Sequence, residues 1–143
     1  MSVNNAMMPL QGYIVWRSLA TSTYEDITLE FVKNHLGLYY IKYMETFVIF
    51  TIPNVSEILN IRDGSTVTPN CFILFRREVR LCISSIGLRI GRTALSRHMS
   101  NIWQDLRINE PDLVDLFREV ANNAARIFND QRLRIRLIDG SHL

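Results

Sequence analysis

The segment TPNCFILFRREVR, residues 68–80, decides the fold of the second half of the chain. If it is helical, one of its faces is apolar at steps of three and four residues: Phe72, Phe75, Val79 and Cys82. The adjoining face has the same spacing but a different character: Ile73, Arg76, Arg77 and Arg80. One apolar residue, Ile73, therefore heads a row of arginines on a face where water and charge are expected.

The length and composition of the chain predict a folded protein. Its 143 residues fit one domain, or one small domain with a structured extension. Hydrophobic residues make up 48% of the chain, with seven Phe, five Tyr and two Trp. This is enough apolar surface to form a core, which excludes a disordered chain.

Charge is distributed unevenly between the two halves. Residues 1–65 carry four basic and six acidic side chains, a net charge of −2, whereas residues 66–143 carry twelve and eight, a net charge of +4. All twelve basic residues of the second half are arginine. Arginine suits bidentate contacts to phosphates and bases, although the nucleotide composition of the gene could produce the same bias.

Neither a metal site nor an enzyme active site is expected. Cys71 and Cys82 lie about three helical turns apart, which fits neither a disulfide nor a zinc site, and the three histidines are scattered. The chain has no glycine-rich phosphate loop and no nucleophile–base pair that its spacing supports. We therefore predict no cofactor and no enzymatic activity.

A membrane span is not expected either. The most apolar run, residues 38–52, contains Lys42 and Glu45 and is too short to cross a bilayer. No secretory signal is visible at the N-terminus.

The first half, residues 1–65, is predicted to be a small α+β extension of unknown role. STYEDITLEFVKNHLG, residues 22–37, has acids near its start and ends in glycine, which predicts a helix. Residues 38–52 are rich in β-branched and aromatic residues and predict one or two strands that end at Pro53. A short helix at 54–61 precedes a turn-rich boundary at 60–70.

Three helices are predicted in the second half. The first spans about residues 70–84, and the second begins near Thr93. The third begins at Pro111, because proline suits a first helical turn. One large aromatic from each helix is expected in the core: Phe75, Trp103 and Phe117. Beyond the third helix, RLRIRL at 132–137 alternates arginine with aliphatic residues, which predicts an extended arm.

Three segments resemble the HMG box, most closely the sequence-specific boxes of fungal mating-type and SOX-like proteins. They are PNCFILFRR at 69–77, ALSRHMSNIW at 94–103 and LFREVANNA at 116–124. The resemblance implies a mainly α chain, with an L-shaped three-helix box at residues 66–137. The α+β extension, residues 1–65, would precede it, and a short tail, residues 138–143, would follow.

The resemblance also implies a set of DNA-contacting residues. Ile73 matches the apolar wedge that enters between base pairs, Phe72 the residue that stacks beside it, and Asn70 an asparagine that bonds base edges. The other predicted contacts are arginines and hydroxyl-bearing residues of the three helices and the arm: Arg76, Arg77, Arg80, Arg92, Thr93, Ser96, Arg97, Arg132, Arg134 and Arg136.

The residues themselves leave other roles open. Asn70 follows a proline and also suits a helix N-cap. Phe72 shares a face with Phe75, so it could belong to the core. An isolated exposed aliphatic residue such as Ile73 needs no special explanation.

The resemblance implies a nuclear, sequence-specific transcriptional regulator of mating type or sexual development. It would bind an A·T-rich site in double-stranded DNA through the minor groove and bend it, and a second mating-type or transcriptional regulator could dock on its first half. The alternative is a protein-interaction module with weak or no DNA binding of its own. That alternative is motivated by the modest charge and by STVTPN, residues 65–70, which stands where such boxes carry a basic arm.

Overall fold

The computed structural model describes residues 9–18, 22–24, 27–61 and 70–139, without the side chains of 22–24, 59–61, 132 and 134–139. Five strands precede four helices along the chain. The elements are β1 (Ile14–Arg17), β2 (Ser22–Tyr24), β3 (Ile27–Asn34), β4 (Tyr39–Tyr43), β5 (Thr46–Phe50), α1 (Val55–Ile61), α2 (Cys71–Ser85), α3 (Arg92–Asn109) and α4 (Pro111–Asp139).

The strands form one antiparallel sheet in the order β1-β3-β4-β5, with β2 paired to the other end of β3. Tight turns between β3 and β4 and between β4 and β5 set the register of the central strands, and the first of them is held by side-chain hydrogen bonds. Asn34 Oδ1 accepts hydrogen bonds from the backbone N–H groups of Leu36 (3.0 Å) and Leu38 (2.8 Å), and Gly37 supplies the positive φ of 86° that this turn needs. Phe31 then pairs with Ile41, and Ile41 with Val48.

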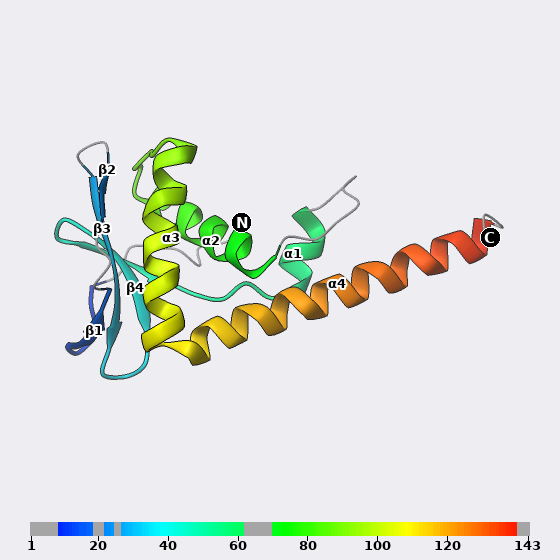
Figure 1. The fold of residues 1–143 in the computed structure, drawn as a ribbon, viewed down its shortest axis with the longest axis horizontal. Coiled ribbons are helices and arrows are strands. Elements are labelled where there is room, and N and C mark those ends of the chain that lie inside the picture. Colours follow the sequence, from blue (N-terminus) through cyan, green and yellow to red (C-terminus); the bar gives the residue numbers. More distant parts are fainter. Residues whose placement is uncertain (1–8, 19–21, 25–26, 62–69, 140–143) are drawn as a thin grey trace.

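Helices cover one face of this sheet (Figure 1). α2 packs on β4 and β5, α3 packs on β2, and α4 contacts α1, α2 and α3. In Figure 1, α4 leads away from the lower end of α3, passes beside α1 and extends beyond the sheet.

The sheet and the helices share one hydrophobic core. Phe31 and Phe50 of the sheet and Phe75 of α2 are almost fully buried. The Phe75 ring centroid lies 5.6 Å from that of Phe31 and 5.6 Å from that of Phe50. Such contacts between large aromatic rings contribute strongly to core stability, so the sheet is an integral part of the fold.

The predicted fold class is therefore wrong. A mainly α chain with an L-shaped three-helix HMG box was expected, whereas the structure is a mixed α and β fold with a five-stranded sheet. The apolar face of the sheet and those of the helices bury one another. The helical sequence patterns alone do not predict this packing. The predicted boundary between the two halves falls largely on residues 62–69, outside the described residues.

The helix predicted at 22–37 is also wrong, because the described part of this segment forms β2 and β3. Leu29, Val32 and Leu36 happen to fit helical spacing. However, Leu29 and Phe31 alternate with Thr28 and Glu30 along a strand paired with β4, and both are completely buried in the core between the sheet and the helices. Non-local strand pairing outweighs a local helical preference here.

The remaining predicted elements have mixed outcomes. The strands at 38–52 and the helices near 54–61, 70–84, 93 and 111 are confirmed. The extended arm at 132–137 is wrong, because α4 continues to Asp139. Arginine and leucine are good helix formers, so extending an existing helix costs little.

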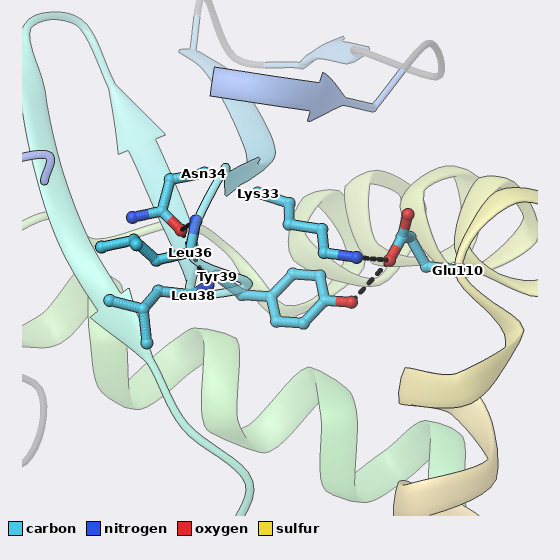
Figure 2. Close-up of polar contacts among 6 residues, drawn as sticks. All are labelled: Lys33, Asn34, Leu36, Leu38, Tyr39 and Glu110. Carbon is cyan, nitrogen blue, oxygen red and sulfur yellow. Dashed lines mark hydrogen bonds and ion pairs between the residues drawn. The ribbon is translucent and has the colours of Figure 1, made fainter. Parts of the chain in front are cut away.

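Lys33, Tyr39 and Glu110 join the sheet to the helices (Figure 2). Glu110 lies between α3 and α4, and its Oε1 atom accepts a hydrogen bond of 2.6 Å from the Tyr39 hydroxyl. The same oxygen lies 3.0 Å from Lys33 Nζ. The junction of the two longest helices is thereby fixed to β3 and β4.

Candidate nucleic-acid interface

α2 and α3 form an antiparallel pair that brings the predicted contact residues of both helices to one side. Near the start of α2, the Phe72 ring centroid lies 6.0 Å from that of Trp103, in the second half of α3. Further along α2, Arg76 Nη1 donates a hydrogen bond of 2.9 Å to Ser96 Oγ. Arg80 and Arg92 then meet at a shared pocket.

This pocket has a volume of about 200 Å³ and is lined by Arg76, Arg80, Ile90, Arg92 and Leu95. Three of the five lining residues are arginines, and no acidic residue among the described ones lines it. Guanidinium groups carry only hydrogen-bond donors and stay charged at any physiological pH. The pocket is therefore suited to an anion, of which a phosphate is the commonest biological example.

Positive charge is concentrated on this helical pair. Residues 71–100 contain six arginines and one acid, Glu78, so their net charge is 6 − 1 = +5. Residues 101–143 contain six arginines and seven acids, so their net charge is 6 − 7 = −1. A positively charged patch on a protein with little net charge attracts a polyanion to that one face of the molecule.

Asn70 caps the start of α2. Its Oδ1 atom accepts a hydrogen bond of 2.9 Å from the backbone N–H of Ile73. The side-chain oxygen therefore has a structural partner, as an N-cap requires. Asn70 is exposed, and it lies at the same end of α2 as Ile73.

Ile73 and Phe72 have different surroundings. Phe72 is half-buried and packs against the core, so the core role left open for it is present. Ile73 is also half-buried, but it is not among the described apolar side chains packed against that core. Its side chain lies on the arginine side of α2, next to the pocket-lining positions.

Arg77 lies next to a buried acid. Its Nη1 atom is 3.2 Å from the carboxylate of Glu78, which is 5% exposed. Burial raises the pKa of Glu78 to about 7; Arg77 opposes this shift and Glu57 adds to it. Because the charge of Arg77 is partly neutralised by Glu78, Arg77 attracts a phosphate less strongly than the exposed Arg80.

The first turn of α3 adds exposed polar residues. Arg92 and Thr93 are exposed, and no side chain caps the helix at Gly91. Backbone N–H groups at a helix N-terminus carry partial positive charge, which adds to that of the arginines. Arg97 is exposed one turn further along, next to half-buried Ser96.

The three arginines of the predicted arm are placed by the backbone alone. Arg132, Arg134 and Arg136 lie in the last turns of α4, and their side chains are outside the described residues. That end of α4 lies beyond α1 and away from α3 (Figure 1). The structure therefore does not bring these backbone positions to the pocket.

The three aromatics expected in the core lie together. Phe75 and Phe117 are fully buried and Trp103 is 8% exposed. The ring centroids of Phe75 and Trp103 are 5.0 Å apart, those of Phe75 and Phe117 5.8 Å, and those of Trp103 and Phe117 6.1 Å. These three rings hold α2, α3 and α4 together in the core, beneath the arginine-lined surface of α2 and α3.

The sequence reasoning overlooked Glu78. A signal was present, because Glu78 is three residues from Phe75 and four from Cys82, on the side of the helix that faces the core. It overlooked Glu110 as well, for which the sequence holds no local signal. The partners of Glu110, Lys33 and Tyr39, are 77 and 71 residues away.

Neither a metal-binding cluster nor a membrane-spanning helix is present in the described part of the chain. Among the described residues, no group of His, Cys, Asp and Glu side chains is arranged to hold a metal ion. No helix in the described part of the chain combines the length and apolar composition of a membrane span. No protein-family model, no curated protein and no solved structure matches this chain.

Proposed function

We propose that this chain is a sequence-specific DNA-binding protein that bends double-stranded DNA through the minor groove. The observation that carries the proposal is the pocket lined by Arg76, Arg80 and Arg92, where α2 meets the start of α3 in a helical pair with a net charge of +5. Arginines on one rigid face provide the sequence-independent grip on phosphates that supplies much of DNA-binding affinity.

Ile73 is the proposed wedge. It lies on the arginine side of α2 and outside the apolar contacts of the core, and Asn70 is exposed at the same helix end. An apolar side chain that enters between base pairs costs a few kcal/mol of unstacking, which wider contact with the bent duplex offsets. A·T-rich sites suit such bending because flexible steps such as TA lower its cost.

A cellular role is proposed from sequence resemblance. The segments that resemble mating-type boxes are residues 69–77, 94–103 and 116–124. In that role the protein is a nuclear transcriptional regulator of mating type or sexual development. A second regulator would dock on the sheet side of the molecule.

The second candidate function is a protein-interaction module that binds DNA poorly or not at all. Two contacts favour it, because Asn70 Oδ1 is engaged by the helix cap and Arg77 is paired with Glu78. DNA would have to displace an internal partner to bond Asn70 Oδ1 or Arg77 Nη1. Such an exchange lowers the net gain from each contact.

A duplex titration separates the two functions. Fluorescence anisotropy with a labelled A·T-rich duplex at about 50 to 200 mM salt should give a straight line of log affinity against log salt. The slope of a DNA-binding protein should be about −0.9 for each phosphate neutralised, which for three arginines is about −3. A flat line, or no binding at the lowest salt, would favour the interaction module.

A further inference from the structure

A second pocket adjoins the arginine-lined one, at the turn between α2 and α3. It has a volume of about 330 Å³ and shares Arg80 and Ile90 with its neighbour. Its polar side chains are those of Arg80, Ser84 and Arg89, and no acidic residue among the described ones lines it. Arg89 belongs to neither helix and was not among the contact residues expected from the sequence.

The backbone of this turn is held firmly by hydrogen bonds. The N–H of Gly87 donates to the carbonyl of Ser84 (3.0 Å), and the N–H of Leu88 donates to the carbonyl of Ile83 (3.0 Å). Gly87 has a φ of 77°, so the two bonds form the glycine-terminated helix end known as a Schellman motif. Arg89 follows directly on this fixed segment.

Apolar packing anchors the same turn. Ile83 is buried in the core, and Leu88 and Ile90 on either side of Arg89 pack against that core. A basic residue between two anchored neighbours loses little backbone freedom when it binds a ligand. The turn therefore presents Arg89 in a pre-organised position.

The outer side of the turn is open to a ligand. Ser84 and Arg89 are exposed, and a side chain at Gly87 would meet no atom within 4 Å. A hydroxyl and two guanidinium groups all donate hydrogen bonds to anionic oxygens. The chemistry of the pocket matches the non-bridging oxygens of a phosphodiester.

We infer that Arg80, Ser84 and Arg89 form a further DNA-phosphate site, which extends the DNA contact around the end of α2 onto the turn. This inference rests on the DNA-binding function proposed above. Arg80 lines both pockets, so the two sites form one continuous track along a DNA strand. The track gives phosphate contact and hence affinity, without reading base identity.

Arg89→Gln tests the inference in the full chain. Loss of one phosphate contact should weaken binding several-fold at low salt and reduce the salt slope by about 1. Arg89→Lys keeps the charge and should restore the slope. Ser84→Ala should weaken binding to a smaller extent without changing the slope, because a neutral donor displaces no counterion.

Arg107→Gln is the matched control, because Arg107 is an exposed arginine at the opposite end of α3. It should leave both affinity and slope unchanged, and circular dichroism should show that all variants are folded. If Arg89→Gln behaves like Arg107→Gln while the wild-type protein binds the duplex, the site at the turn is overturned and the proposed function stands. If the wild-type protein shows no salt-dependent binding, both are overturned.

Discussion

The hydroxyl of Tyr39 donates a hydrogen bond of 2.6 Å to the carboxylate of Glu110, across the boundary between the sheet and the helices. Burial and this bond raise the pKa of Tyr39 above its ordinary value, so the hydroxyl keeps its proton. Glu110 also accepts, at its backbone carbonyl, the N–H of Leu113 (3.1 Å) at the start of α4. One residue thus ends α3, begins α4 and holds both to the sheet.

We expect Tyr39→Phe to lower the free energy of unfolding by about 1–2 kcal/mol, because the partly buried carboxylate loses a donor. Chemical denaturation followed by circular dichroism would measure the change. Tyr43→Phe, which removes a hydroxyl from the same strand, should change stability by less than about 0.5 kcal/mol. Equal effects of the two substitutions would show that the Glu110 bond contributes nothing specific.

Glu78 should make stability depend on pH. Burial raises its pKa from 4.5 to about 7, so the folded protein binds a proton more readily than the unfolded chain between these values. Stability contributed by this site is therefore present below about pH 5 and is lost as the pH rises through 7. Glu78→Gln should be more stable than the wild-type protein at pH 8, by about 2 kcal/mol after allowance for solvent screening.

Thermal unfolding at several pH values would measure this effect. The gain from Glu78→Gln should shrink as the pH falls toward 5, since the wild-type carboxyl is then protonated. Glu119→Gln, at an exposed position of α4, is the control and should show no such trend. A gain at pH 5 as large as that at pH 8 would contradict the assignment of the pH dependence to Glu78.

Ile73→Ala should reduce DNA bending more than it reduces binding. The wedge contributes to unstacking, whereas the arginines supply the salt-dependent grip. Fluorescence resonance energy transfer between the two ends of a labelled duplex would measure the bend, and the salt slope should stay the same. Leu81→Ala removes an exposed apolar residue about two turns further along α2 and should leave the bend unchanged.

Gly12 should be intolerant of any side chain. It has a φ of 71°, and an added Cβ would overlap the imidazole of His35. That ring stacks on Tyr13 with centroids 4.3 Å apart, and its Nδ1 atom accepts the Tyr13 N–H at 3.3 Å. We expect Gly12→Ala to cost about 3 kcal/mol, from the unfavourable backbone conformation and the displaced ring.

Gly37→Ala separates the two causes, because Gly37 has a φ of 86° but no atom within 4 Å of an added Cβ. It should cost only the backbone penalty, about 1–2 kcal/mol. The two variants can be compared by urea denaturation. Equal losses would mean that the His35 ring moves aside freely.

Local signals predicted much of the helical part of this fold from the sequence. Asn70 marked the start of α2 and Pro111 the start of α4, and both act within the first turn of their helix. Helical spacing of three, four and seven residues also predicted that Ile73 and the arginines lie on a common side of α2. These are effects of neighbours three or four residues apart, which a sequence displays directly.

What the sequence could not display was contact between distant segments. Pairing with β4 decides that residues 27–34 form a strand, although their apolar residues partly fit a helix. The Arg76–Ser96 bond and the pocket at Arg80 and Arg92 depend on how α2 and α3 pack. The raised pKa of Glu78 likewise depends on burial and on Glu57 of α1, 21 residues earlier in the chain.

The aromatic contacts of Phe75 have a practical consequence for experiments on this protein. Its ring contacts Phe31 and Phe50 from the sheet as well as Trp103 and Phe117 from the helices. A fragment that begins near residue 66 would leave one side of this cluster in water, at a cost of about 25 cal/mol for each Å² of apolar surface exposed. Truncated forms made to map DNA binding should therefore retain β3 to β5, or a loss of binding will report only a loss of folding.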